Sequence, residues 1–377
     1  MTYRNNRNGQ EIDFAGDLGI IALENCKDFG KKLDESIRFL RLQQGIPTPD
    51  SFLIDTAQIR FSNGEGKILL NESVRGKDVF LISDVGNYSC TYPLYGYDNH
   101  MSPDEHYQDI KRAVSAIGGK AARVNVVMPM LYASRQDRRK GRESLDCAMS
   151  LQELENMGVK AVITFDVHNS GVINAASHMS FENIFASYEI VRAFFEDEPD
   201  VINDKENLLI ISPDVGGMER AIYYSNVMKT DVGMFYKRRD YSRVVDGRNP
   251  IVQHDYLGRD VTGKNIMIID DMIGTGESMV EIVQELKKRN AGKIFIATTF
   301  AMFTKGCGTF QKLHDEGLLT RLYSTNLTYV PPEIIGTKWF HHVDMSPFAA
   351  EIIHCLNTNS SIEPIMDATA RLKELNK

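Results

Sequence analysis

The chain has 377 residues, of which 42% are hydrophobic and 25% are charged. That length predicts two to three domains, and that balance excludes a disordered, collagen-like or low-complexity protein. The 43 Lys and Arg residues are outnumbered by 51 Asp and Glu residues, which gives a formal net charge of −8. An acidic chain lacks the general attraction that nucleic acid or an anionic membrane requires, so we expect neither as a partner.

Cysteine usage and the amino-terminal sequence both favour an intracellular protein. The five cysteines are scattered and form neither a CxxC pair nor a zinc-finger spacing. The opening residues, MTYRNNRNGQEIDF, are polar, and no run of about 18 apolar residues occurs in the sequence. We therefore expect a cytoplasmic protein that is not inserted in a membrane.

From residue 66 onward, β-rich runs alternate with runs of helical period, as is typical of parallel strands joined by crossover helices. Most of the β-rich runs are continuously apolar, which indicates strands covered on both faces. We expect eight strands, at residues 78–85, 122–131, 160–167, 208–214, 232–238, 265–270, 293–300 and 321–326. The pattern predicts an α/β fold.

Three helices are expected. Residues 102–105 form a capping box with proline at the first helical position, and the helix ends at Gly118. A second helix, at 279–289, has an apolar stripe and basic residues at its carboxyl end, where the helix dipole favours cations. The stretch 348–375 is helical in pattern and is expected to pack back on the first domain.

The segment IMIIDDMIGTGES, at residues 266–278, carries the strongest chemical signal. Two acids stand at the end of an apolar strand, and a glycine-containing turn leads into a helix whose first N–H groups can hold a phosphate. An ordinary strand, turn and helix, with a serine as N-cap, is the alternative. The candidate residues are Asp270, Asp271, Gly274, Thr275, Gly276, Glu277 and Ser278.

A second segment, SRQDRRKGR at residues 134–142, is densely basic in a net acidic protein. It is either a solvated charged loop or a loop that grips polyphosphate with guanidinium groups. Asp166 and His168 follow another predicted strand, and because residues two apart on a strand share a side, they could share one ligand. Asp214 lies in SPDVGG, which by itself reads as a turn leading into a helix.

Two further segments have a structural and a functional reading. Lys237 and Arg239 lie two apart after an apolar strand, so both could project towards one site, or both could extend their charges into water. The segment FSNGE, at residues 61–65, contains Asn-Gly and could be a hairpin turn.

These segments together resemble one enzyme family. The 266–278 segment is similar to the phosphoribosyl-pyrophosphate-binding motif of type I phosphoribosyltransferases, in which two acids hold the ribose hydroxyls. The order and approximate spacing of all the segments resemble those of ribose-phosphate pyrophosphokinases, also called phosphoribosyl pyrophosphate synthetases, over roughly residues 55–355. The resemblance implies two phosphoribosyltransferase-type domains, each with a mainly parallel, doubly wound sheet.

The resemblance also implies a reaction and roles for the candidate residues. The diphosphoryl group of ATP would pass to the 1-hydroxyl of ribose 5-phosphate, with Mg²⁺ as cofactor. Lys237 and Arg239, on a flexible loop, would stabilise the transition state. The remaining implied roles are ATP binding by Phe61, Asn63, Glu65, Arg135, Gln136 and Asp137, sugar and phosphate binding by the 270–278 candidates, and metal binding by His168, Asp214 and Asp166.

The resemblance sets the expected organisation. We expect a first domain at 15–180, completed by the C-terminal helices at 346–377, and a second domain at 181–345. The family completes its ATP site across subunits, with the 61–65 segment reaching a neighbour's adenine. A homo-oligomer built from dimers, with a hexamer as one form, is therefore expected.

The sequence departs from the family pattern near the acceptor sugar. Gly274 stands where the family has an acid, and Asn63 and the stretch HNSGVINA also differ. This clustering suggests, as an alternative, a larger 5-substituted ribose such as ADP-ribose as acceptor. A non-catalytic regulatory paralogue is a second alternative, but the basic loop and metal-binding candidates that such a protein should have lost are present.

Overall fold

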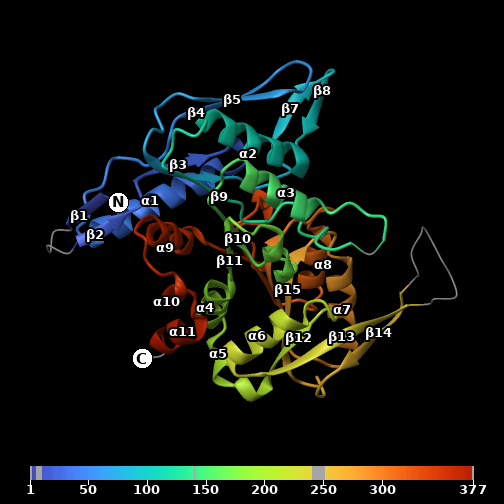
Figure 1. Cartoon of the computed structure of the whole chain (residues 1–377). Helices are drawn as coiled ribbons and strands as arrows, with labels where there is room; N and C mark the ends of the chain where they lie inside the picture. Colours follow the sequence, from blue (N-terminus) through green and yellow to red (C-terminus); the bar gives the residue numbers. More distant parts are fainter. Residues whose placement is uncertain (1, 6–10, 140, 240–250, 376–377) are drawn as a thin grey trace. The chain divides into compact units, whose positions relative to one another are not determined.

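A computed structural model of the chain describes residues 2–5, 11–139, 141–239 and 251–375 (Figure 1). The chain divides into two compact units, each built on one large sheet. The first unit comprises residues 1–185, 326–329 and 344–367, and the second comprises residues 186–325, 330–343 and 368–377. The α/β prediction is confirmed in both units.

The first unit contains a five-stranded, wholly parallel sheet in the order β11-β10-β9-β6-β3. Its strands are β3 (Asp17–Ala22), β6 (Lys77–Ile82), β9 (Arg123–Val127), β10 (Ala161–Phe165) and β11 (Ser180–Ile184). Its helices are α1 (Lys27–Gln43), α2 (Pro103–Ile117), α3 (Asp146–Asn156), α9 (Ser346–Asn357) and α10 (Glu363–Met366), with 3₁₀ turns at Glu24–Cys26 and Ser170–Ala175.

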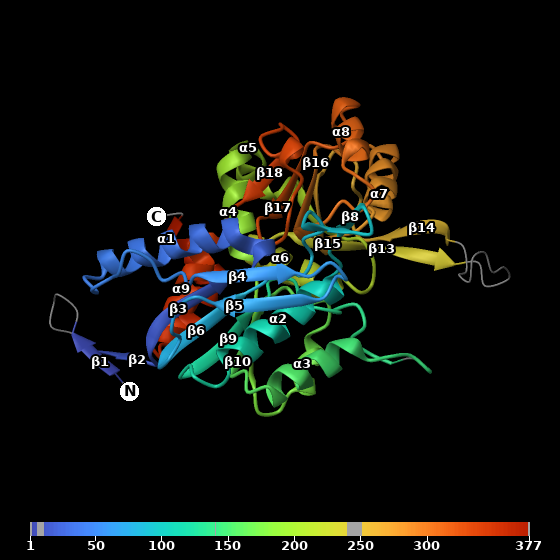
Figure 2. The ribbon, with the colours of Figure 1, turned by 90° about the horizontal axis from the view of Figure 1, so that it is seen from above.

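Three small antiparallel hairpins also belong to the first unit. They are β1 (Thr2–Asn5) with β2 (Glu11–Phe14), β4 (Thr56–Arg60) with β5 (Gly66–Leu70), and β7 (Thr91–Leu94) with β8 (Tyr97–His100). The β4–β5 hairpin packs on α2, as Figure 2 shows. This packing determines where the turn between β4 and β5 is presented.

The second unit contains a seven-stranded sheet in the order β14-β13-β12-β15-β16-β17-β18, in which β14 alone is antiparallel to its neighbour. Its strands are β12 (Leu208–Ser212), β13 (Asp231–Arg239), β14 (Ile251–Leu257), β15 (Asn265–Ile273), β16 (Ile294–Ala301), β17 (Arg321–Thr325) and β18 (Phe340–Val343). Its helices are α4 (Ser187–Asp197), α5 (Pro199–Asn203), α6 (Met218–Met228), α7 (Glu277–Lys288), α8 (Gly308–Asp315) and α11 (Ala368–Leu375), with 3₁₀ turns at Lys205–Asn207 and Pro332–Ile334.

Helices cover both faces of the second sheet. Alternate residues of β16 face opposite sides, so Ile294 and Ile296 join the core that contains Ile282 of α7. Phe295 points the other way, and its ring centroid lies 5.0 Å from that of Phe194 on α4. The sheet is therefore doubly wound, and its central strands β12, β15 and β16 are largely apolar because both of their faces are buried.

All eight predicted strands of the large sheets are present, and the four that were not predicted, β3, β11, β14 and β18, are the four edge strands. Strands β11, β14 and β18 mix polar with apolar residues, so they lack the continuous apolar signal of central strands. Strand β3 is mainly apolar, but it lies before residue 66, where the predicted alternation begins. Strand β11 spans the expected domain break at 180/181, and the first unit extends to Phe185. The predicted capping box of α2 is confirmed, and Gly118 has a φ of 58° at its end.

The C-terminal stretch differs in part from its prediction. Helix α9 packs on α1 of the first unit, as expected. Helix α11 instead packs on α4 of the second unit, where Arg371 Nη2 lies 3.3 Å from Glu189 Oε1 and stacks on the ring of Tyr188. The prediction that all of residues 346–377 complete the first domain is therefore wrong for its last helix, because that helix has a charged and aromatic partner in the second unit.

Candidate functional site

The two acids of the 266–278 segment lie inside a strand, not at its end. Strand β15 continues to Ile273, which still pairs with Ala301 of β16. Asp270 Oδ1 accepts the N–H of Asp271 at 2.9 Å, and Asp271 Oδ1 accepts the N–H of Met272 at 2.9 Å. Burial and the charge of the adjacent carboxylate raise the pKa of Asp270 well above its usual value.

A cation that sequence reasoning missed lies beside the acid pair. Arg220 Nη2 on α6 is 3.8 Å from Asp271 Oδ2, and both side chains are mostly buried. Arg220 follows the SPDVGG turn. Its place in the first turn of the helix after a candidate segment was the sequence signal that could have identified it. This contact joins two candidate segments at the carboxyl ends of neighbouring strands β12 and β15.

The turn after β15 depends on Gly276, which has a φ of 81°. A Cβ atom there would lie 2.6 Å from Phe310 Cε2, so the turn needs glycine for space as well as for conformation. Helix α7 begins at Glu277 with Gly276 as N-cap, and Ser278 lies in its first turn instead of capping it. Glu277 pairs with Lys305 at 2.6 Å, and both side chains are exposed. Its carboxylate also interacts with the Thr275 side chain of the turn, so its expected outward orientation stays a prediction.

Two further hydrogen bonds hold the rest of the turn. The carbonyl of Gly274 accepts the N–H of Thr304 at 3.0 Å, and the hydroxyl of the exposed Thr275 accepts the N–H of Glu277 at 3.4 Å. The amino end of the 12-residue helix α7 follows immediately. A helix start of this kind concentrates N–H donors and the positive end of the dipole, which suits a phosphate.

Asp214 lies in a turn, as the simpler reading predicts. The Ser212 hydroxyl donates to the carbonyl of Asp214 at 2.7 Å, and Asp214 Oδ1 accepts the N–H of Gly217 at 3.2 Å. Helix α6 begins directly afterwards at Met218. The Asp214 side chain is half-buried, so a carboxylate is presented at the carboxyl end of β12.

In the first unit, the basic segment is a loop that follows β9. Arg135 is exposed, and Gln136 Nε2 donates to the carbonyl of Ser144 at 2.9 Å. Asp137 accepts a hydrogen bond from Asn169 Nδ2 and lies 4.0 Å from Arg138 Nε. Asn169 therefore ties the basic loop to the loop after β10, a link that no sequence pattern indicated.

Asp166 and His168 lie beyond the end of their strand, and whether they share one ligand stays a prediction. Strand β10 ends at Phe165, and Asp166 has a φ of 39°, so strand alternation does not extend to these residues. Asp166 is 3% exposed, whereas His168 is exposed. Such a φ is uncommon for a residue other than glycine and marks a backbone held by its surroundings.

The FSNGE segment forms the turn of the β4–β5 hairpin, which confirms its hairpin reading. The Phe61 N–H donates to the carbonyl of Glu65 at 2.8 Å, and the N–H of Gly64 to that of Phe61 at 2.9 Å. Asn63 Nδ2 donates to Glu65 Oε2 at 2.8 Å. Phe61 is 49% exposed, so an aromatic ring and two polar side chains are presented to solvent.

The predicted catalytic pair lies in strand, not in a loop. Lys237 and Arg239 belong to β13, where they pair with His254 and Ile251 of β14. Their side chains lie outside the part that the structure describes, and their catalytic role stays a prediction.

The described part of the chain contains no cluster of three or more His, Cys, Asp or Glu side chains arranged to hold a metal ion. Magnesium is often bound through only one or two carboxylates together with substrate phosphates, so such a cluster is not required. Among its helices, none combines the length and apolar character needed to span a membrane.

Comparison with known proteins assigns both halves of the chain. Residues 18–158 match the N-terminal domain of ribose phosphate pyrophosphokinase, and residues 174–324 match the phosphoribosyl transferase domain. Ribose-phosphate pyrophosphokinase of Haemophilus ducreyi is 30% identical over 314 residues, covering 82% of this chain and 90% of that protein. The Pasteurella multocida enzyme of the same name is 29% identical over 306 residues, covering 80% and 88%.

A solved structure shows the same fold. The phosphoribosylpyrophosphate synthetase of Mycobacterium smegmatis superposes with a TM-score of 0.72 at 19% identity, covering 91% of this chain and all of that one. The domain matches, the level of identity and the shared fold agree with one another. The chain belongs to the ribose-phosphate pyrophosphokinase family.

Proposed function

We propose that this protein transfers the diphosphoryl group of ATP to the 1-hydroxyl of ribose 5-phosphate, giving phosphoribosyl pyrophosphate and AMP. The sugar oxygen attacks the β-phosphorus, the bond from the β-phosphorus to the α,β-bridging oxygen breaks with its electron pair leaving on AMP, and the hydroxyl proton passes to water. The observation that carries the proposal is the acid pair Asp270 and Asp271 in the strand that leads into the turn opening α7, in a chain of this family.

In this proposal the second unit binds the sugar phosphate. The ribose hydroxyls donate hydrogen bonds to Asp270 and Asp271, and such bonds favour the charged carboxylate that burial opposes in Asp270. The 5-phosphate accepts hydrogen bonds from the 274–278 turn and the start of α7. Arg220 offsets part of the charge of the acid pair.

The nucleotide is assigned to other segments. We propose that Arg135, Gln136 and Asp137 contact the ATP phosphates, and that Phe61, Asn63 and Glu65 contact adenine, in a homo-oligomer. Magnesium, when bound, would neutralise charge on the phosphoryl oxygens, and Asp214 and His168 are the residues proposed to hold it. The buried Asp166 is not carried into this role.

Lys237 and Arg239 are proposed to stabilise charge that develops on the transferred group. Removing one preorganised charge of this kind commonly lowers the rate by about a hundredfold or more, or roughly 3 kcal/mol. We therefore expect Lys237→Ala and Arg239→Ala to lower turnover far more than they weaken ATP binding. Lys288→Ala, an exposed change at the end of α7, is the control.

The decisive assay measures AMP and phosphoribosyl pyrophosphate formed from ATP, magnesium and ribose 5-phosphate. Parallel reactions with ADP-ribose as acceptor test the alternative that the substitution of glycine at residue 274 suggested. Formation of AMP with ribose 5-phosphate supports the proposal. Formation of AMP with ADP-ribose and not with ribose 5-phosphate would mean that ADP-ribose is the acceptor. No AMP with either sugar would favour the non-catalytic alternative.

A further inference from the structure

The β4–β5 hairpin that presents residues 61–65 has little apolar surface to fix it. An isolated two-stranded hairpin is only marginally stable in water. Residues 56–70 are all described, and among their apolar side chains Ile68 alone is buried, at 7% exposed. Ile59 and Leu69 are 38% and 37% exposed. Polar contacts must therefore contribute to the direction in which this hairpin points.

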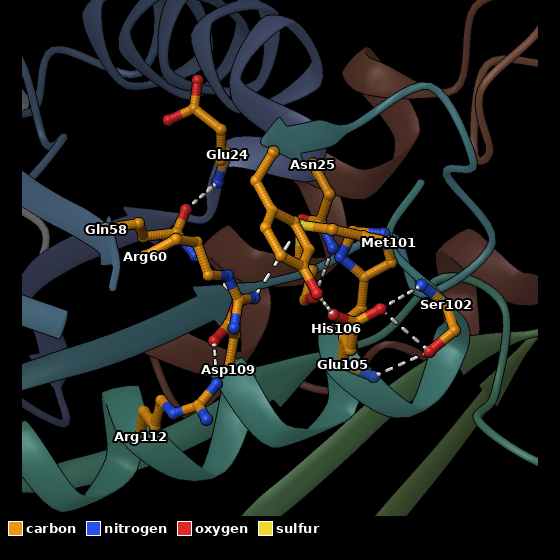
Figure 3. Close-up of polar contacts among 12 residues, drawn as sticks. Glu24, Asn25, Gln58, Arg60, Met101, Ser102, Glu105, His106, Asp109 and Arg112 are labelled. Atoms are coloured by element: carbon orange, nitrogen blue, oxygen red, sulfur yellow. Dashed lines mark hydrogen bonds and ion pairs between the residues drawn. The ribbon is translucent and has the colours of Figure 1, made fainter. Parts of the chain in front are cut away.

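An ion triad ties the hairpin to helix α2. The Asp109 carboxylate lies between two guanidinium groups, with Arg60 Nη2 2.5 Å from Oδ2 and Arg112 Nη1 2.7 Å from Oδ1 (Figure 3). Arg60 is the last residue of β4, whereas Asp109 and Arg112 belong to α2. The Asp109 side chain is 6% exposed, and bonds between ionised groups in such surroundings are strong. The triad thus fixes the backbone immediately before Phe61.

A second set of contacts reaches the turn from the β7–β8 hairpin. The Arg60 guanidinium lies 5.5 Å from the ring centroid of Tyr92, and the Tyr92 hydroxyl donates to Glu105 Oε1 at 2.6 Å. Glu105 also accepts the N–H of Ser102 at 2.8 Å within the capping box of α2. A Cβ on Gly64 would contact the Tyr92 hydroxyl at 3.6 Å, so Tyr92 flanks the 61–65 turn itself.

Burying charges is a costly way to stabilise a fold. The loss of hydration offsets much of the attraction, and apolar residues of the same volume often stabilise as well. The Asp109 carboxylate binds one guanidinium at each oxygen, so the directions of these hydrogen bonds set the position of β4 on α2, which apolar contacts would not. A turn held at a fixed angle loses less conformational freedom when it binds a ligand.

We propose that Arg60 and Asp109 are positioning residues for nucleotide recognition. Their ion pair holds the 61–65 turn in the orientation that reads the base of ATP, and neither side chain touches the nucleotide. The inference rests on the proposed function, which assigns the base to Phe61, Asn63 and Glu65. The inference adds that the selectivity for the base depends on the carboxylate of Asp109, which lies 49 residues after Arg60 in the sequence.

The test is Asp109→Asn in the full-length protein. The variant keeps the shape of the side chain but loses the charge that holds both arginines. We expect KM for ATP to rise about tenfold and the preference for ATP over GTP to fall. We expect kcat at saturating ATP and KM for ribose 5-phosphate to stay within about twofold of wild type, as for loss of uniform binding.

Glu153→Gln is the matched control. Glu153 of α3 pairs with Lys111 of α2 at 3.2 Å, so this change also removes a carboxylate from a pair involving α2, but without touching the hairpin. It should leave both KM values and the base preference at wild-type levels. If Asp109→Asn does not fold, Arg60→Lys is the second variant, because it keeps the charge and loses the guanidinium group. It should also raise KM for ATP without changing KM for ribose 5-phosphate, but by a smaller factor.

Three outcomes overturn the inference. In the first, folded Asp109→Asn keeps the wild-type KM for ATP and the wild-type base preference. In the second, Asp109→Asn has a lower melting temperature and all of its kinetic parameters fall equally. In the third, Glu153→Gln shows the same shift in KM for ATP. If the wild type makes no phosphoribosyl pyrophosphate, the proposed function has failed instead. Calorimetric titration with ATP then tests the positioning separately, where about tenfold weaker binding by Asp109→Asn supports it and equal binding overturns it.

Discussion

Replacing Gly276 by alanine should damage both the stability of the second unit and the binding of the sugar phosphate. The residue has a φ of 81°, and placing an alanine in this left-handed conformation costs about 1–2 kcal/mol. The added Cβ would lie 2.6 and 2.7 Å from two ring carbons of Phe310, and overpacking of this kind costs about 1–3 kcal/mol more. We expect the free energy of unfolding to fall by about 2–5 kcal/mol in total.

Gly306 provides a matched control for the backbone part of this effect. It also has a φ of 81°, but no heavy atom lies within 4 Å of the position of its Cβ. Gly306→Ala should therefore lose only the backbone contribution of about 1–2 kcal/mol. Denaturant unfolding of both variants at neutral pH measures the difference, which isolates the clash with Phe310.

The kinetic consequence follows from the same geometry. If the 274–278 turn holds the 5-phosphate, Gly276→Ala should raise KM for ribose 5-phosphate by about tenfold or more, equivalent to about 1.4 kcal/mol, whereas Gly306→Ala should not. Equal stability losses in the two variants would refute the steric argument. A wild-type KM in Gly276→Ala would refute the assignment of the phosphate to this turn.

Three further changes have defined outcomes. Glu277→Gln removes an exposed ion pair with Lys305, which lowers the pKa of Glu277. Because exposed ion pairs contribute little, we expect no change in the denaturation midpoint or in KM for ribose 5-phosphate. A raised KM would mean that Glu277 faces the sugar phosphate. Burial and a neighbouring guanidinium lower the pKa of His354 from 6.5 to about 4. The unfolded imidazole then binds a proton that the folded one does not, so stability should fall by about 1.4 kcal/mol per pH unit between pH 6.5 and 4. His354→Gln should flatten that part of a denaturation series across pH, and an unchanged slope would contradict the pKa. Ser102→Ala removes the N-cap of α2 and should lower the free energy of unfolding by about 0.5–2 kcal/mol. An unchanged free energy of unfolding would show that Glu105 alone is a sufficient cap.

The sequence indicated the central strands and missed three of the four edge strands for one physical reason, with the mainly apolar β3 as the exception. Strands β10 and β12 are buried on both faces, so their residues are continuously apolar and stand out. Strand β11, with the sequence SFENI, has one neighbour and carries polar side chains. An edge strand is defined by which strand it pairs with, and that pairing is a property of the folded sheet.

Within the candidate site, local sequence was enough to predict the features that span only a few residues. The adjacency of Asp270 and Asp271, the glycine turn and the start of α7 follow from local backbone preferences. The same local logic did not hold at Asp166, because the strand ends at Phe165, two residues before its predicted end, and the backbone of Asp166 has a positive φ.

Which distant side chains meet follows from the pairing of strands and the packing of helices. Arg220 reaches Asp271 because β12 and β15 pair, and Arg60 reaches Asp109 because a hairpin packs on a helix. Local sequence sets the backbone of each element through steric preferences and hydrogen bonds between near neighbours. Contacts across long separations form only when buried surfaces bring whole elements together, so no short motif encodes them.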